Sequence, residues 1–218
     1  MQNQYKIEVR MMKQILCFGD SNTYGYIPEN GKRYAFADRW TGILSGRLEK
    51  EDCRVIEEGL CGRTTVFEDE LRIGRRGADL LPVLLESHSP VNRVILMLGT
   101  NDCKTVYGAS AEVIGKGIEK LINQIKSADE ATKILLISPI WLGEGVWEEG
   151  YDQEFNENSV ETSKKLKKVY ERIASDYGCD FLAASDYVKP SEADREHLSL
   201  ESHRILSEVI YKKLKQCA

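Results

Sequence analysis

The stretch QILCFGDSNTYG, residues 14–25, indicates the fold class more clearly than any other part of the sequence. Its first half, Gln14–Gly19, is a short apolar run of the kind found in buried β-strands. The second half turns polar at once, and glycines bracket a tight turn that carries Asp20 and Ser21. Because this turn follows the strand directly, the hydroxyl of Ser21 is expected at the carboxyl edge of a β-sheet.

Outward from this stretch, short apolar runs alternate with longer amphipathic segments. Four more strands are predicted, at Cys53–Glu57, Asn92–Leu98, Lys133–Ser138 and Asp180–Ala184. Five helices are predicted, at Trp40–Glu51, Leu80–Glu86, Ala111–Ser127, Asn158–Tyr177 (with Gly178 as its C-cap) and Ser199–Lys215. This alternation predicts an α/β fold, a three-layer α/β/α sandwich with a mainly parallel five-stranded sheet, formed by one domain over residues 1–218. Residues 1–13 precede the first strand and are expected to form a loose N-terminal arm.

The composition argues against several classes of protein. The 218 residues carry a net charge of −5 and no dominant Lys/Arg cluster, so nucleic-acid binding is not expected. The apolar runs are far shorter than the about 20 residues that span a membrane, and the N-terminus lacks a signal-peptide core, which together predict a cytoplasmic protein with no membrane partner. The six cysteines form no CxxC pair, which favours buried thiols in a reducing compartment over a zinc site.

Four polar clusters are the candidates for a functional site. They are Gly19-Asp20-Ser21-Asn22, Gly59-Leu60-Cys61-Gly62-Arg63-Thr64-Thr65, Gly99-Thr100-Asn101-Asp102 and Asp194-Arg195-Glu196-His197. The first three follow predicted strands directly, and the last follows the final strand and a loop. Strand–helix alternation brings the carboxyl ends of all parallel strands to one edge of the sheet, where ligands bind. We therefore expect the four clusters to meet in one site.

Ser21 needs a neighbouring base to act as a nucleophile at neutral pH, and histidine is the usual one. Of the three histidines, His88 precedes a predicted strand and so belongs at the opposite edge of the sheet, while His203 lies inside the final helix. His197 is the histidine at the carboxyl edge. Asp194, three residues earlier, can reach the imidazole and select its tautomer.

Acyl transfer also needs hydrogen-bond donors aimed at the developing oxyanion. The backbone N–H groups of Ser21 and Gly62 and the side-chain amide of Asn101 can supply them. Taken singly, these residues have structural explanations as well: Ser21 could be a helix N-cap, and Gly62 and Asn101 could be turn residues. Asp194 and His197 could be a surface pair. Their arrival together at one edge of the sheet favours a catalytic site.

Three other interpretations remain open from the residues alone. A thiol nucleophile at Cys61 or Cys103 would replace Ser21. A flavodoxin-like nucleotide-binding module would use the turn at residues 19–25 to cradle a phosphate, but the sequence lacks GxGxxG and GxxxxGK[ST] and this reading leaves the last cluster without a role. A carrier-protein site at Asp20-Ser21 would require a short helical bundle, whereas here the motif follows an apolar strand.

The four clusters resemble the sequence blocks of the SGNH (GDSL-type) hydrolase family, in the same order and spacing over almost the whole chain. The corresponding stretches are Gly19-Asp20-Ser21-Asn22 for the first block, with Asn22 in place of the leucine of GDSL, Gly62 for the second, Gly99-Thr100-Asn101-Asp102 for the third (GTND), and Asp194 with His197 for DxxH. The segments Asp38–Gly42 and Glu57–Thr65 are similar to the arylesterase/acyltransferase branch. Gly62 follows the broader family, where one acyltransferase of this branch has alanine, which favours hydrolysis over acyl transfer.

This resemblance implies a flavodoxin-like SGNH hydrolase fold and a serine esterase that hydrolyses short-chain aryl or O-acetyl esters through an acyl-enzyme intermediate. It implies that Ser21 attacks the ester carbonyl, His197 moves the proton and Asp194 orients His197. Ser21, Gly62 and Asn101 would form the oxyanion hole. It implies no metal or organic cofactor, and a homo-oligomer. Acyltransferase, carbohydrate O-acetyl esterase, thioesterase and lysophospholipase activities are alternatives within the same family.

Candidate substrate contacts come from aromatic side chains. The segment Trp141–Asn156 joins a strand to a helix and exceeds the usual length of about 2–6 residues, so it could be a pocket wall, a lid, a subunit contact or an ordinary packed loop. The candidate pocket residues are Tyr24, Trp40, Trp141 and Trp147, although the helical spacing of Trp40 also suits the core. We expect hydrolysis to fall steeply as the acyl chain lengthens, and to rise with pH near neutrality as His197 loses its proton.

Overall fold

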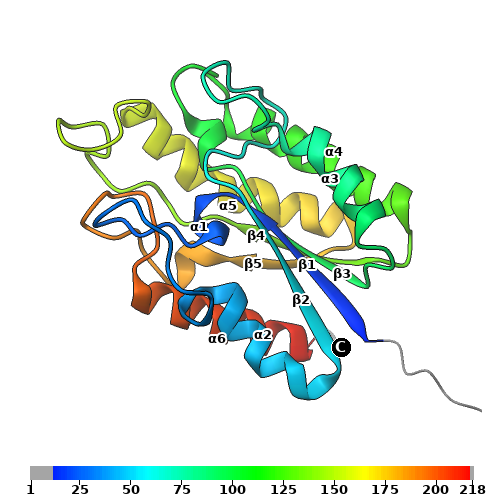
Figure 1. Cartoon of the computed structure of the whole chain (residues 1–218). Coiled ribbons are helices and arrows are strands. Elements are labelled where there is room, and N and C mark those ends of the chain that lie inside the picture. Colours follow the sequence, from blue (N-terminus) through cyan, green and yellow to red (C-terminus); the bar gives the residue numbers. More distant parts are fainter. Residues whose placement is uncertain (1–11, 217–218) are drawn as a thin grey trace, which may run out of the picture.

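The five strands form one parallel sheet (Figure 1). The computed structural model of the chain describes residues 12–216, so the predicted N-terminal arm falls largely on residues outside the described part. The strands are β1 (Lys13–Gly19), β2 (Cys53–Gly59), β3 (Arg93–Met97), β4 (Lys133–Ser138) and β5 (Asp180–Ala183). They pair in the order β2-β1-β3-β4-β5, and every pair is parallel. Each strand therefore ends at the same edge of the sheet.

Helices cover both faces of this sheet (Figure 1). One face carries α3 (Gly77–Ser87), α4 (Ala111–Ala128) and α5 (Glu157–Tyr177), and the other carries α2 (Trp40–Leu48) and α6 (Leu200–Gln216). A single turn of helix, α1 (Ser21–Tyr24), follows β1. The predicted α/β class and its three-layer α/β/α arrangement are thereby confirmed.

Two apolar cores hold the layers together, one on each side of the sheet. Successive side chains of a strand point to opposite faces. Leu16 and Phe18 of β1 accordingly lie in the core beneath α3, α4 and α5, whereas Ile15 and Cys17 lie in the core beneath α2 and α6. Both faces of β1 and β3 are covered, which explains why their sequences are continuously apolar.

The element boundaries differ from the predictions by a few residues. Helix α3 begins at Gly77, three residues before the predicted start, and contains Pro82. Helix α2 ends at Leu48 and continues only as a 3₁₀ turn, which Asp52 terminates with φ 53°. Strand β2 runs on to Gly59 because it stays in register with β1 to its last residue. Pairing with a neighbouring strand sets such ends, and a sequence window does not contain that neighbour.

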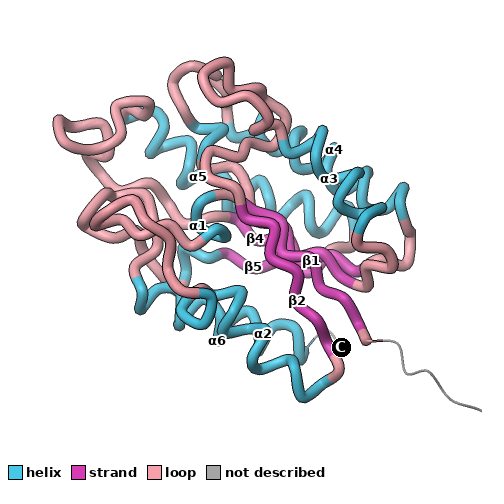
Figure 2. Tube along the Cα trace, in the orientation of Figure 1, coloured by secondary structure: helices cyan, strands magenta, loops and turns pink. Residues whose placement is uncertain are grey.

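The loops that follow the strands gather at one end of the molecule (Figure 2). They include the segments after β1, β2 and β3 and the long connection between β4 and α5. The strands deliver these loops to a common edge, as the parallel topology requires. This edge contains the candidate site.

Trp40 belongs to the core. Its side chain is completely buried, and its indole N–H donates a hydrogen bond of 3.1 Å to the carbonyl oxygen of Asn22. The prediction that Trp40 lines a substrate pocket is therefore wrong, because the face of α2 that carries it packs against the sheet and α6. Trp40 instead occupies the core position that its helical spacing also suggested.

We expect Trp40→Phe to lower the free energy of unfolding by about 1–3 kcal/mol, because it removes buried ring atoms and leaves the Asn22 carbonyl without its donor. Urea unfolding of the variant measures this change. Trp141→Phe is the matched control, since that side chain is 41% exposed and should change stability by less than about 0.5 kcal/mol. Equal effects of the two substitutions would contradict the burial argument.

Candidate active site

A tight turn at the end of β1 presents Ser21 at the edge of the sheet. Asp20 is the N-cap of α1, and its side chain accepts a hydrogen bond of 2.9 Å from the N–H of Asn22. A Cβ at Gly19 would collide with the side chain of Thr23, so the chain can turn this sharply only with glycine there. The Ser21 hydroxyl lies at the bottom of a pocket although the residue is only 4% exposed.

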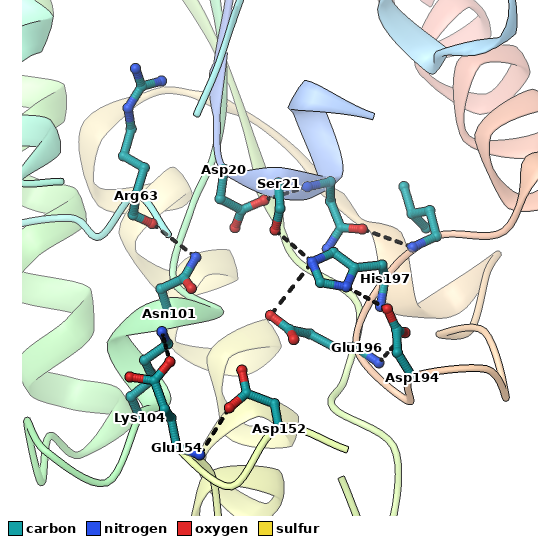
Figure 3. A network of polar contacts seen from close by, with 12 residues as sticks. Asp20, Ser21, Arg63, Asn101, Lys104, Asp152, Glu154, Asp194, Glu196 and His197 are labelled. Atoms are coloured by element: carbon teal, nitrogen blue, oxygen red, sulfur yellow. Dashed lines mark hydrogen bonds and ion pairs between the residues drawn. The ribbon is translucent and has the colours of Figure 1, made fainter. Parts of the chain in front are cut away.

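His197 approaches Ser21 from the other end of the sequence (Figure 3). Its Nε2 lies 2.8 Å from the Ser21 Oγ, and its Nδ1 lies 2.6 Å from Oδ2 of Asp194. The other carboxylate oxygen of Asp194 accepts the backbone N–H groups of Glu196 and His197, which shapes the loop around the imidazole. A serine, a histidine and an aspartate in this sequence of contacts have the geometry that a nucleophile–base–orienter triad requires.

A second contact joins the turn that carries Ser21 to the loop that carries His197. The side-chain oxygen of Asn22 accepts a hydrogen bond of 2.8 Å from the N–H of Leu198, next to His197. The ring of Tyr26 packs against the imidazole of His197 with the two centroids 4.3 Å apart. The loop that carries His197 is therefore attached directly to the turn that carries Ser21.

The surroundings of His197 favour its protonated form. Burial by itself would lower the pKa of His197, but the carboxylates of Glu196, Asp194 and Asp20 outweigh it and raise the pKa to about 9. Burial opposes ionisation of Asp194 as well, yet its hydrogen bond to His197 lowers the pKa of that carboxyl below its usual value. The rise in rate with pH is therefore expected at higher pH than the near-neutral value predicted for an unperturbed histidine.

Three residues that line the same pocket offer hydrogen-bond donors. The Asn101 side-chain amide donates one N–H to the carbonyl oxygen of Arg63 at 3.1 Å, which leaves its second N–H for a ligand. Gly62 has φ 81°, a conformation that side chains rarely adopt, and it lines the pocket beside Ser21. Within residues 12–216 the backbone N–H groups of Ser21 and Gly62 donate to no acceptor. An oxyanion site requires donors of this kind.

Asp102 connects the loops that carry these donors. Its buried carboxylate accepts hydrogen bonds from the backbone N–H of Thr65, at 3.0 and 3.1 Å, and from the Thr65 hydroxyl at 2.5 Å. Burial raises the pKa of Asp102 to about 7, and the hydrogen bonds from Thr65 oppose this rise. Asp102 thereby positions the loop after β2 against the loop after β3.

The pocket above Ser21 has a volume of about 430 Å³ and is lined mainly by polar and charged side chains. Besides the five predicted residues, its lining includes Tyr26, Cys61, Arg72, Lys104, Tyr151, Asp152, Glu154 and Glu196. A larger open groove of about 850 Å³ lies between α3 and α4, but none of the residues of the triad lines it. The chemistry is therefore assigned to the smaller pocket.

Comparison with known proteins assigns the chain to a family. Residues 17–205 match the model of the GDSL-like lipase/acylhydrolase family. The chain belongs to this family. GDSL-like hydrolases cleave carboxylic esters, and the chain is accordingly a carboxylic ester hydrolase. No curated protein sequence matches it significantly.

Solved structures of esterases are similar to this GDSL-like hydrolase over nearly their whole length. Est24, a carbohydrate acetylesterase from Sinorhizobium meliloti, is 34% identical with a TM-score of 0.87, covering 94% of this chain and 100% of that one. The aryl esterase of M. smegmatis is 33% identical with a TM-score of 0.87, covering 94% and 99%. A lipase/acylhydrolase from Enterococcus faecalis, 20% identical with a TM-score of 0.67 and coverage of 94% and 96%, shares the fold.

The other predicted pocket residues of the hydrolase lie outside the pocket lining. The guanidinium of Arg33 covers the ring of Tyr24 at 4.0 Å from its centroid. Trp141 is 41% exposed to solvent, and Trp147 packs against the core beneath α3, α4 and α5. The aromatic segment after β4 does reach the pocket, but through Tyr151 and its acidic neighbours rather than through the tryptophans.

Sequence reasoning missed the charged lining of the pocket. Glu196 is adjacent to His197 in the sequence, and this adjacency was the available signal for it. Lys104 and Arg72 carried no signal, because neither belongs to a strand-end cluster. Cys61 lines the pocket but burial raises its pKa, and Cys103 is buried with an even stronger rise, which disfavours a thiolate nucleophile at either position.

No helix within residues 12–216 is long and apolar enough to cross a membrane. In the same part of the chain, no group of three or more His, Cys, Asp or Glu side chains is arranged to hold a metal ion.

We expect Asn101→Ala to lower kcat by about 10²- to 10³-fold with a smaller change in KM, because an oxyanion donor acts mainly in the transition state. Steady-state hydrolysis of p-nitrophenyl acetate measures both constants. Asn123→Ala is the matched control, since Asn123 is exposed on α4 and lies outside the pocket. An unchanged kcat in Asn101→Ala would remove Asn101 from the oxyanion hole.

Proposed function

We propose that the chain is a serine esterase that hydrolyses short-chain aryl or O-acetyl esters through an acyl-enzyme intermediate. The observation that carries this proposal is the line of contacts from Asp194 Oδ2 through His197 to the Ser21 Oγ, at 2.6 and 2.8 Å, beneath a pocket with three free donors. Few reactions other than acyl transfer use a serine, a base and an oxyanion site together.

The first half of the reaction forms the acyl-enzyme. His197 Nε2 takes the proton of the Ser21 hydroxyl as Oγ attacks the ester carbonyl carbon. The carbonyl oxygen becomes an oxyanion, which the N–H groups of Ser21 and Gly62 and the amide of Asn101 bind. The C–O bond to the alcohol then breaks, and His197 returns its proton to the leaving oxygen. Asp194 stays ionised and stabilises the imidazolium.

The second half repeats these steps with water in place of Ser21. His197 takes a proton from the water, whose oxygen attacks the acyl carbon, and then returns that proton to the Ser21 Oγ as the acid leaves. The same donors bind the second oxyanion. An alcohol in place of water would give acyl transfer, which stays a second candidate activity.

The lining of the pocket supports a short acyl group and a polar alcohol. Each buried CH₂ of an acyl chain gains about 0.8 kcal/mol only when it leaves water for an apolar surface. The walls beyond Ser21 instead carry Lys104, Asp152 and Glu154, so a long chain would lie against charges. The 34% identity with a carbohydrate acetylesterase is a reason to test O-acetyl sugars beside aryl esters. Assembly into homo-oligomers and a cytoplasmic location stay predictions.

The test is a series of p-nitrophenyl esters from acetate through butanoate to octanoate, together with acetate release from O-acetyl sugars. We expect kcat/KM to be largest for acetate and to fall with each lengthening of the chain. A value that rises out to octanoate would point to a lipase-like acyl site and contradict the proposed substrate class.

A further inference from the structure

The carboxylate of Glu196 is a second acidic group close to the His197 imidazole, and it lies on the side of the ring that faces Ser21. One of its carboxylate oxygens lies 3.7 Å from Nε2, the same ring nitrogen that contacts the Ser21 Oγ (Figure 3). The Glu196 residue is only 6% exposed, and what remains exposed faces the pocket. Within residues 12–216, His197 supplies the one cationic nitrogen within 4.0 Å of this carboxylate.

The backbone at Arg195 turns Glu196 inward. Arg195 has φ 60°, a left-handed conformation that is uncommon for a residue with a side chain. Its guanidinium donates to the carbonyl oxygen of Gly145 at 3.0 Å and to Glu148 at 2.7 Å, and it lies over the ring of Tyr151 at 4.1 Å from the centroid. These contacts hold the strained residue in place. The next side chain, Glu196, is consequently directed at the imidazole.

The other charged and titratable groups around the pair come from the loops of the site and from α6. Around His197 and Glu196 they are Asp194, Asp20, Tyr26, Cys61, Lys104, Asp152 and, on α6, His203. Lys104 is engaged in an ion pair of 2.5 Å with Glu154, and burial lowers the pKa of His203 to about 4, so His203 is neutral. The anionic groups therefore dominate around the imidazole.

We propose that Glu196 is a positioning residue for His197. The carboxylate of Glu196 stabilises the imidazolium from the Nε2 side, as the carboxylate of Asp194 does from the Nδ1 side. This inference rests on the proposed esterase function. Glu196 carries no proton in the reaction: the Ser21 proton moves to Nε2 and from there to the leaving oxygen. Its negative charge stabilises the imidazolium that forms in the transition state, and equally stabilises the resting imidazolium, which is inactive as a base.

The Glu196 carboxylate therefore lowers the reaction rate at low pH and raises it at high pH. Below the pKa of His197 the carboxylate lowers the fraction of enzyme with a free base, and above it the carboxylate only assists the transition state. Burial raises the pKa of Glu196 to about 7, so this group is ionised throughout the alkaline range in which His197 loses its proton. Removing the charge should therefore help at neutral pH and harm at alkaline pH.

The test compares Glu196→Gln, which keeps the shape of the side chain, with the wild type. The matched control is Glu192→Gln, which removes the same charge from an exposed position in the same loop, outside the pocket. The first readout is kcat/KM for p-nitrophenyl acetate from about pH 6 to about pH 10, with Ser21→Ala as the blank. The second is an NMR titration of the histidine imidazoles, with His197 assigned by the signal that His197→Asn loses.

We expect the rising limb of the wild-type profile, and the His197 titration, to move down by about 1–2 pH units in Glu196→Gln. The kcat/KM of Glu196→Gln should exceed that of the wild type at pH 7 and fall below it at pH 10. The pH profile of Glu192→Gln should coincide with that of the wild type. A structural defect would lower the rate at every pH and would not produce this crossover. Coinciding titrations of His197 in Glu196→Gln and the wild type would overturn the inference.

The two readouts separate this inference from the proposed function. A wild type without Ser21-dependent hydrolysis of any tested ester would contradict the proposed function. The NMR titration needs no substrate, so it would still decide whether Glu196 holds the proton on His197.

Discussion

Ser21→Ala is expected to lower kcat for p-nitrophenyl acetate by about 10⁴- to 10⁶-fold, leaving only the contribution of binding and of the oxyanion donors. The hydroxyl lies 2.8 Å from the base, and no other nucleophile in the pocket has such a neighbour. Initial rates, corrected for spontaneous hydrolysis, measure the loss. Retained folding is checked by thermal unfolding, since removing one oxygen should leave the turn at the end of β1 intact.

The control for Ser21→Ala is Ser45→Ala on α2, which makes the same chemical change outside the pocket and should retain wild-type kcat. A Ser21→Ala variant with wild-type activity would show that the nucleophile has been assigned wrongly. Cys61 would then be the next residue to replace, because it is the thiol that lines the pocket.

Asp194→Asn is expected to lower kcat by about 10⁴-fold while leaving the loop folded. The Asn side chain can still accept the backbone N–H groups of Glu196 and His197 through its oxygen. Its NH₂ group would face Nδ1 and require that nitrogen to be an acceptor, so the proton of neutral His197 would sit on Nε2. In that tautomer Nε2 cannot take the Ser21 proton.

Steady-state kinetics and thermal unfolding together test this prediction. Asp186→Asn is the control, because Asp186 is exposed, pairs with Lys167 and does not line the pocket. If Asp194→Asn unfolds at the wild-type temperature and keeps its kcat, Asp194 has no part in selecting the tautomer. A loss of both stability and activity would be resolved by adding Asp194→Glu, which keeps the charge but moves it.

Sequence patterns predicted the order of strands and helices and the meeting of four polar clusters. Apolar runs such as Lys133–Ser138 are buried on both faces of the sheet, so they can be predicted as strands without any knowledge of their neighbours. Ser21 and His197 could be paired because a parallel sheet brings the carboxyl ends of its strands to one edge. Element ends were less predictable, since pairing with β1 is what extends β2 to Gly59.

The pocket wall was the least predictable part of the site. Trp40 was a candidate as an aromatic side chain, although its helical spacing also suited the core, and packing against α6 and the sheet buries it completely. Trp141 and Trp147 belong to the segment that does reach the pocket, yet Tyr151 and Asp152 are its lining residues. The direction in which an irregular loop points its side chains depends on distant contacts that no local pattern contains.

By itself, the sequence determined the α/β class, the edge at which Ser21, Asn101 and His197 meet, and the donors available there, because periodicity and strand-end position are local properties. Only the tertiary structure decided what surrounds them. The left-handed backbone of Arg195, held by Gly145 and Glu148, turns the carboxylate of Glu196 onto His197. The electrostatic environment of the base is therefore a property of side chains brought together by folding, and it sets the pH at which the base is free.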